Sequence, residues 1–189
     1  LMKILDHVIT LDTETGGLDP FHHSLLSIGL ISGDGKHTDE FYVLESELVT
    51  DPRGMEVNRI DLEHVRAHGL APIDACERLE RFAQLACPDG GGVIAGHNIA
   101  FDIAFLRRLY RMAQRPIPGL FCHRTLDTHT MLWALGRAGR IPANVRGSDA
   151  AFRYFDIEPP PELRHTALGD AVATRKLLAA LMELMGSAQ

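Results

Sequence analysis

The chain has 189 residues, of which 46% are hydrophobic and 23% charged, and its formal net charge is −6. Such a length and composition predict one globular domain and exclude disordered, collagen-like and coiled-coil chains. The negative charge argues against a broad duplex-binding surface, which needs many lysines and arginines, but it is compatible with a short grip on one strand end.

The apolar residues and the cysteines indicate in which cellular compartment the protein works. No apolar run approaches the roughly 18–20 residues of a membrane span, and no leader pattern begins the chain. The three cysteines, Cys76, Cys87 and Cys122, form no CxxC pair, which favours free thiols in a reducing compartment. We therefore expect a cytoplasmic protein that does not enter a membrane.

The first half of the chain predicts a sheet and then helices. β-branched residues indicate a strand over 5–12, which stops at a Thr-Glu-Thr-Gly-Gly turn. Residues 25–32 and 37–44 indicate two more strands, and the Gly-Asp-Gly between them is typical of a hairpin. These three strands predict an antiparallel meander. Helices near 55–68 and 72–86 follow, and then a short strand over 93–96.

The second half is mostly helical. An apolar stripe with spacings of 4, 3, 4 and 3 starts at Ile99 and ends at Ala113, and further helices are indicated near 127–136 and 148–155. A proline-rich loop over 159–161 precedes a last helix from about Ala167 to Met185. The order of elements predicts an α/β fold, with a mixed central sheet flanked by helices, in a single domain over 1–189.

Three short segments at the ends of these elements carry acidic side chains. Asp12 and Glu14 end the first strand and point to one face, where Mg²⁺ or a similar hard cation could relieve their repulsion. Asn98 could cap the next helix, with Asp102 one turn later. His165 and Asp170 surround the start of the last helix. Taken singly, each is as easily an acidic turn, a helix-dipole partner or a cap.

Taken together, these segments resemble a known family. The motifs DTETGGLD, HNIAFD and HTALGD, in that order, are similar to the three exonuclease motifs of the DEDDh 3′→5′ exonucleases, which include polymerase proofreading subunits, ribonuclease T and oligoribonuclease. The similarity runs from Val8 to about Leu181. It implies a ribonuclease H-like fold, and His165 marks the branch because a sister group carries tyrosine at that position.

The resemblance implies a metal-dependent 3′→5′ exonuclease that hydrolyses the 3′-terminal phosphodiester of single-stranded nucleic acid to nucleoside 5′-monophosphates. Two divalent cations, Mg²⁺ or Mn²⁺, would clamp the attacking and leaving oxygens. Their ligands would be Asp12, Glu14, Asp102 and Asp170, and His165 would be the general base. DNA is slightly favoured over RNA.

The resemblance also implies residues that hold the strand end. Backbone groups of Thr13, Thr15 and Gly16 would meet the terminal sugar, and Leu18 would wedge beside the last base, with Phe21 as a second candidate. The opposite wall would be lined by Asn98 and Phe101, although Phe101 is equally well explained as a core residue.

Other residues receive structural interpretations. Arg107, Arg108, Arg111 and Arg115 point away from Asp102 on a helical wheel, which favours a solvated face over a phosphate track or partner surface. Asp127 is interpreted as a helix N-cap. Only 19 residues follow Asp170, so we expect no polymerase partner; the oligomeric state is open and includes a homodimer.

Two other hypotheses stay open at this point. One is a non-catalytic module on the same fold that binds nucleic acid or nucleotides without hydrolysing them. The other is an acidic α/β domain whose motifs match by chance, and a failure of Mn²⁺ to raise its melting temperature would favour that one.

Overall fold

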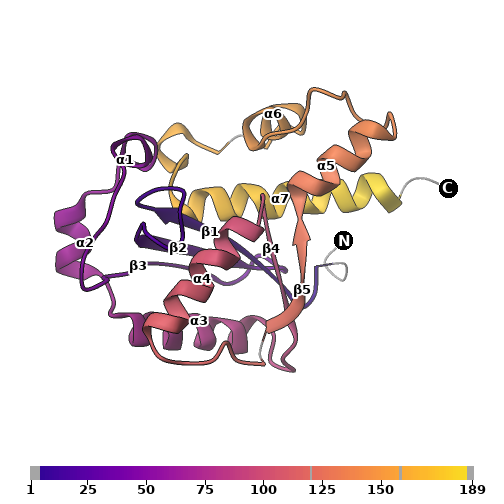
Figure 1. The fold of residues 1–189 in the computed structure, drawn as a ribbon. Helices are drawn as coiled ribbons and strands as arrows, with labels where there is room; N and C mark the ends of the chain where they lie inside the picture. The colour runs from indigo at the N-terminus through magenta and orange to yellow at the C-terminus, as the bar shows by residue number, and fades with distance from the viewer. Residues whose placement is uncertain (1–4, 120, 158, 187–189) are drawn as a thin grey trace.

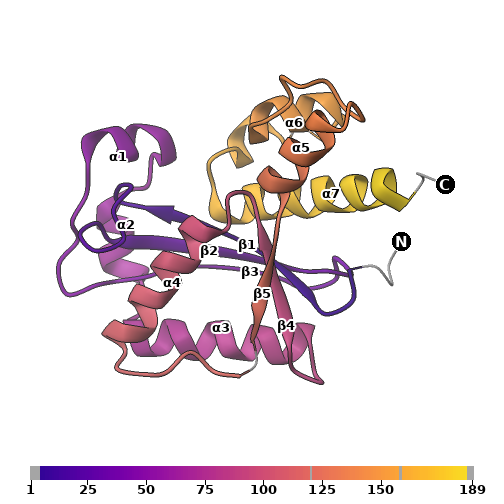
Figure 2. The ribbon, with the colours of Figure 1, turned by 45° about the vertical axis from the view of Figure 1, so that its right-hand side comes forward.

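A five-stranded sheet lies between two layers of helices in the computed structural model, which describes residues 5–119, 121–157 and 159–186 (Figures 1 and 2). The strand order is β3-β2-β1-β4-β5. β1 (Val8–Thr15), β2 (Leu25–Ser32) and β3 (Thr38–Tyr42) form an antiparallel meander, whereas β4 (Gly92–Gly96) and β5 (Phe121–Asp127) run parallel to β1. The predicted mixed sheet with an N-terminal meander is confirmed.

β1 differs from its prediction in a way that matters for the site. It begins at Val8, after a turn closed by a bond from the Val8 amide to the Leu5 carbonyl, and it continues through Thr15. It extends because β2 supplies partners for it as far as the pair of Thr15 with Leu25. Thr13, Glu14 and Thr15, which we expected in the turn, are therefore strand, and only the two glycines of that segment lie beyond it.

Two long helices cover one face of the sheet and a third covers the other. α3 (Pro72–Ala86) and α4 (Ala100–Met112) bury apolar side chains such as Leu79, Phe105 and Leu109 against the sheet. α7 (Ala167–Gly186) crosses the opposite face, and α5 (Thr128–Arg137), α6 (Ser148–Tyr154) and the short 3-10 turn η2 (Pro161–Leu163) lie around it (Figure 2). Both faces of the sheet are thus buried, as a doubly covered α/β sheet requires.

The helix expected over 55–68 is wrong, because two short helices replace it. α1 (Pro52–Asn58) ends where Arg59 adopts a left-handed conformation with φ of 56°. α2 (Leu62–His68) then starts afresh, and the Asp61 carboxylate accepts a bond from the Glu63 amide as its N-cap. The cap competes with helix continuation, so the chain turns between the two.

β5 is a strand that the sequence analysis missed. It is an edge strand paired only with β4, and its middle residues, His123, Arg124 and Thr125, are exposed. An edge strand with polar, exposed residues lacks the apolar run by which a buried strand is recognised. Among the described residues, no helix combines the length and apolar character that crossing a membrane would require.

Candidate active site

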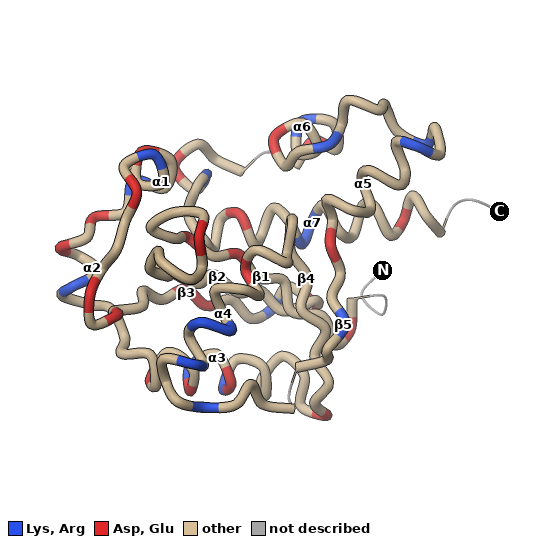
Figure 3. The backbone as a smooth tube through the Cα atoms, viewed as in Figure 1, with Lys and Arg blue, Asp and Glu red and all other residues tan. Residues whose placement is uncertain are grey.

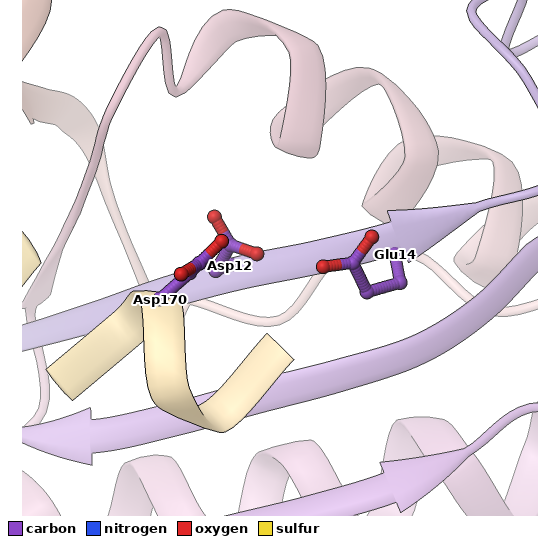
Figure 4. A group of neighbouring side chains, drawn as sticks. All are labelled: Asp12, Glu14 and Asp170. Atoms are coloured by element: carbon purple, nitrogen blue, oxygen red, sulfur yellow. The ribbon is translucent and has the colours of Figure 1, made fainter. Parts of the chain in front are cut away.

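Carboxylates from β1, the central strand of the sheet, and from α7 lie side by side (Figure 4). Asp12, Glu14 and Asp170 each offer a carboxylate oxygen, and these oxygens all lie within 4.8 Å of one another. Asp12 and Glu14 share a face of β1 because they are two residues apart in a strand. Asp170 joins them from the first turn of α7. The structure thus brings together residues that are more than 150 positions apart.

Asp102 lies beside this group in a different environment. It sits in the first turn of α4 and is only 4% exposed. Its Oδ1 accepts hydrogen bonds from the Thr13 amide at 2.9 Å and from the Thr13 hydroxyl at 2.7 Å. The amide and the hydroxyl of Thr13 therefore both orient Asp102.

The topology of the sheet explains why these segments converge. β1, β4 and β5 are parallel, so their carboxyl ends lie at one edge, and α4 starts four residues after β4 ends. Gly29 of β2 lies opposite Asp12 in the register. A Cβ atom on Gly29 would be 2.1 Å from the carbonyl carbon of Ala167, so the glycine is what permits the first turn of α7 to approach β1.

The electrostatics of the group are unfavourable without a counter-charge. Burial, and then the neighbouring carboxylates, raise the pKa of Glu14 to about 8 and the pKa of Asp12 well above its usual range. Burial also raises the pKa of Asp102 and of Asp170. Each carboxylate is disfavoured in its charged form, which is the state that a bound cation would stabilise.

Arg164 is a residue of this site that the sequence analysis missed. Its guanidinium pairs with both Asp170 and Asp149, and it lies 5.3 Å from the ring centroid of Phe152. Its positive charge lowers the pKa of Asp170 and partly offsets the effect of burial. No local pattern marks this arginine, because its partners are set by how α6 packs near α7.

The residues present fit a divalent cation. Their donors are carboxylate oxygens, which hard cations prefer. One of them, Oδ1 of Asp170, is buried without a hydrogen-bond partner among the described residues. A buried acceptor without a partner is costly and calls for an unseen ligand. Asp12, Glu14 and Asp170 could hold such an ion directly, with Asp102 next to them.

His165 lies beside the carboxylate group and is not one of its clustered residues. It precedes α7 with a left-handed backbone, φ 63°, and it lines a cavity of about 290 Å³ together with Glu14. It also lines a second cavity of about 400 Å³ on the side of α6. Histidine is one of the residue types that tolerate this backbone, which turns the chain sharply before the helix.

The loop after β1 carries the two apolar side chains expected to meet a base. Leu18 is 82% exposed and Phe21 is 78% exposed, whereas Thr15 and Gly16 are buried beneath them. The Thr15 hydroxyl donates to the Gly17 carbonyl at 2.8 Å. Two exposed apolar side chains on a fixed loop are available to a ligand.

Asn98 comes just before the N-cap of α4, and Phe101 lies in the first turn of this helix. Asn98 is not the N-cap, which is a wrong expectation: Ile99 holds that position, and Asn98 has a φ of 58°. The backbone amide of Asn98 donates instead to Oδ1 of Asp127 at 2.8 Å. Phe101 is half-buried, with its ring 5.0 Å from that of Phe105. It therefore contributes to the core and keeps one exposed side.

Asp127 has both the expected role and an unexpected one. It caps α5 by accepting from the His129 amide at 3.0 Å, which confirms the N-cap interpretation. The same oxygen accepts from Asn98, so Asp127 also fixes the segment that follows β4.

Basic residues follow one another along α4 and after it (Figure 3). These arginines divide into two kinds by their contacts. Arg107 and Arg111 are exposed, as the solvated-face interpretation predicts. For Arg108 and Arg115 that interpretation is wrong, because Arg108 pairs with the buried Glu45 and Arg115 with Glu80. Arg108 also donates to the Phe21 carbonyl at 3.2 Å and so anchors the loop of Leu18 to α4.

Comparison with known protein families gives a match over most of the chain. The family model RNase_T, described as an exonuclease, matches residues 9–178. This span includes all of the carboxylates above and His165.

Two curated proteins and a solved structure are similar to the chain. A DNA polymerase III subunit epsilon-like protein of Rhodobacter capsulatus is 28% identical over 92% of this chain, and the chain spans 23% of that protein. The 3′-5′ DNA exonuclease Cap18 of Escherichia coli is 26% identical, with 86% of this chain and 84% of that protein covered. E. coli exonuclease I, in complex with a 5cy-dT13 oligonucleotide, matches with a TM-score of 0.76 at 18% identity, over 96% of this chain and 41% of that one. The likeness to exonuclease I confirms the ribonuclease H-like fold.

Proposed function

Because the chain belongs to the RNase_T exonuclease family, of the DEDDh 3′→5′ type, we propose that it hydrolyses the 3′-terminal phosphodiester of single-stranded nucleic acid and releases nucleoside 5′-monophosphates. The observation that carries this proposal is the convergence of Asp12, Glu14 and Asp170 within 4.8 Å. A cluster of half-buried carboxylates on the central strand of the sheet has little structural value, since desolvation and mutual repulsion disfavour each charge.

DNA is the substrate that we favour. Cap18 is named as a DNA exonuclease, and the exonuclease I structure holds a DNA oligonucleotide. RNA remains the second candidate, since discrimination rests on contacts to the 2′-hydroxyl.

The cations would be two Mg²⁺ or Mn²⁺ ions held by Asp12, Glu14, Asp102 and Asp170, and they would supply the positive charge that stabilises the attacking and leaving oxygens. Thr13 keeps Asp102 in place through two hydrogen bonds to Oδ1. Gly29 keeps the first turn of α7 close to Asp12. The ion pair between Arg164 and Asp170 would weaken when a cation is bound, because the cation would then balance the charge of that carboxylate.

His165 would accept the proton of the attacking water. It lines the same cavity as Glu14, and it lies five residues before Asp170 at the start of α7, which supports this role. Histidine is suited to this step because its two protonation states are both accessible near neutral pH.

The strand end would lie between the loop after β1 and the start of α4. Leu18, assisted by Phe21, would stack beside the last base, and backbone groups of Thr13, Thr15 and Gly16 would meet the sugar. Asn98 and the exposed side of Phe101 would form the opposite wall. Stacking on such side chains contributes roughly 1–3 kcal/mol per base and tolerates any sequence.

A time course with 5′-labelled single-stranded DNA and RNA of the same sequence tests the proposal. With Mg²⁺ or Mn²⁺ present, we expect a ladder that shortens from the 3′ end, faster on DNA, and no ladder with Asp12→Ala. Retained strand binding without hydrolysis by the wild-type chain would overturn the proposal in favour of the non-catalytic binding module.

We also propose a cytoplasmic location, because Cys76, Cys87 and Cys122 are all free thiols.

A further inference from the structure

A cavity of about 400 Å³ adjoins His165 on the side away from Glu14. Its walls come from three places that are distant in sequence: Arg59 after α1, Phe152 and Arg153 of α6, and the segment from Pro159 to His165. α1 and α6 lie on the same side of the sheet in both views (Figures 1 and 2). The volume is within the roughly 300–1,000 Å³ typical of ligand sites.

This cavity and the one beside Glu14 are neighbours. Arg59 and His165 line both of them. A chain that leaves the carboxylate group past His165 would therefore enter the 400 Å³ cavity next.

The charge of the cavity is opposite to that of the carboxylate group. Arg59, Arg153 and Arg164 contribute three positive charges, and Asp149 contributes the negative charge that Arg164 offsets. Neither Arg59 nor Arg153 takes part in an ion pair within the described part of the chain, and both side chains are exposed. Two unpaired guanidinium groups are left for an external anion, in a chain whose net charge is −6.

The remaining wall is apolar. Pro159 and Pro161 line it, whereas Phe152 behind them is 1% exposed, with the Arg164 guanidinium 5.3 Å from its ring centroid. Cationic groups next to an apolar wall suit the phosphates and the sugar of a nucleotide.

We propose that this cavity holds the nucleotide on the 5′ side of the scissile phosphodiester, with Arg59 and Arg153 contacting strand phosphates. The inference rests on the proposed function. Arg59 follows α1 and Arg153 belongs to α6, so the two guanidinium groups reach the cavity from separate elements, an arrangement that suits two phosphates of a strand.

The test compares a substrate that fills the cavity with one that does not. The first probe is a dT12 oligonucleotide, whose binding is followed by fluorescence anisotropy in the Asp12→Ala background. The second is the p-nitrophenyl ester of thymidine 5′-monophosphate, which has no 5′ nucleotide and reports on the chemistry alone. The variant is Arg59→Ala with Arg153→Ala, and the charge-matched control is Arg124→Ala with Arg137→Ala, which removes two exposed arginines, one in β5 and one in the last turn of α5.

We expect the double variant to weaken dT12 binding at least tenfold and to reduce the slope of log K against log salt by about 1.4, since each phosphate contact to a single strand contributes about 0.7. The rate on the ester should change less than threefold, and the control should match the wild type in both assays.

Several outcomes would overturn the inference. Unchanged dT12 affinity and salt slope would show that no strand phosphate lies in the cavity. Equal losses on the ester and on dT12 would place the arginines in the chemistry. Loss of thymidine 5′-monophosphate binding with intact dT12 binding would identify a free-mononucleotide site. A wild-type chain that hydrolyses neither substrate refutes the proposed function instead, and the binding arm still tests the cavity.

Discussion

Each carboxylate of the cluster is held by a different kind of neighbour. Asp102 accepts two hydrogen bonds from Thr13, Asp170 pairs with Arg164, and Asp12 and Glu14 rely on the geometry of β1. The two fixed by tertiary contacts are those whose charge is partly compensated. The two on the strand have their pKa values raised by burial and by like charges, and they need a cation most.

At this scale the sequence predicted the acidic residues and His165 but not their partners. The motif residues are recognisable by type and spacing along the chain. Arg164 and Thr13 act through contacts that exist only after α6, α7 and α4 have packed, so no spacing rule reports them.

The first prediction concerns His165. His165→Ala should lower kcat by about 10²–10⁴-fold, because a positioned general base contributes that much. The rise in melting temperature on adding Mn²⁺ should persist, since His165 is not among the clustered carboxylates. Gel-based rates at saturating single-stranded DNA check this, with the exposed β5 residue His123→Ala as control. A rate within twofold of the wild type would exclude the base role.

Single elements position the two sides of the site. The loop after β1 is fixed to α4 by a buried network in which Glu45, 3% exposed, accepts from the Arg108 guanidinium, the Ser24 hydroxyl and the Leu25 amide. Arg108 connects this network to the loop, because it donates a hydrogen bond to the Phe21 carbonyl.

The second prediction tests that network. Glu45→Gln should cost stability at the lower end of the about 3–5 kcal/mol seen for broken buried pairs, because Arg108 keeps some access to solvent. It should also raise KM for a strand end more than it lowers kcat, since Leu18 and Phe21 lose their fixed position. Urea unfolding and steady-state kinetics measure both effects.

The matched control for this network is Glu63→Gln, which breaks the exposed pair with Arg66 and should cost about 0–1 kcal/mol. Equal stability losses in the two variants would contradict the structural role of Glu45.

The third prediction concerns the approach of α7 to the sheet. Gly29→Ala places a Cβ 2.1 Å from the Ala167 carbonyl carbon, so α7 must shift away from β1. We expect a loss of about 1–3 kcal/mol from overpacking and a weaker response to Mn²⁺, because Asp170 moves with α7. Thermal unfolding with and without Mn²⁺ checks both.

Gly136→Ala in α5 serves as the comparison, because its added Cβ meets only ordinary contacts at 3.5 Å or more. This helix-interior change should be neutral or slightly stabilising. If Gly29→Ala binds Mn²⁺ like the wild type, then Gly29 is not what brings Asp170 of α7 close to β1.

The elements also show where the sequence was sufficient. α3 and β2 have the predicted bounds, since Pro72 marks a helix start and the residues of β2 are buried throughout. The break at Arg59 and the edge strand β5 were missed, because a left-handed cap and a solvated edge depend on neighbours rather than on apolar periodicity.

For the whole molecule, the cluster couples stability to pH. Glu14 has a pKa of about 8 in the folded state against an ordinary value of 4.5, so between these values the folded chain binds more protons than the unfolded one. Its contribution to stability is complete below pH 4.5 and is lost as pH rises to about 8. His97 has the opposite sign, because burial lowers its pKa from 6.5 to about 4, and that effect fades above pH 6.5 as the unfolded-state imidazole loses its proton.

The fourth prediction follows from this coupling. In the presence of a chelator, the melting temperature should fall as the pH rises from 7.5 to 8.5, where His97 is almost entirely neutral in both states and the Glu14 carboxyl group loses its proton. Glu14→Gln should flatten the fall, because it has no proton to lose. A divalent cation at a hundred times its Kd should add about 2.7 kcal/mol to the free energy of unfolding at pH 8, since the unfolded chain does not assemble the site. A wild-type melting temperature that is constant or rises over this range, or one that Mn²⁺ leaves unchanged, would mean that the carboxylates are stabilised by the protein alone, and the case for a metal-dependent nuclease would lose its physical basis.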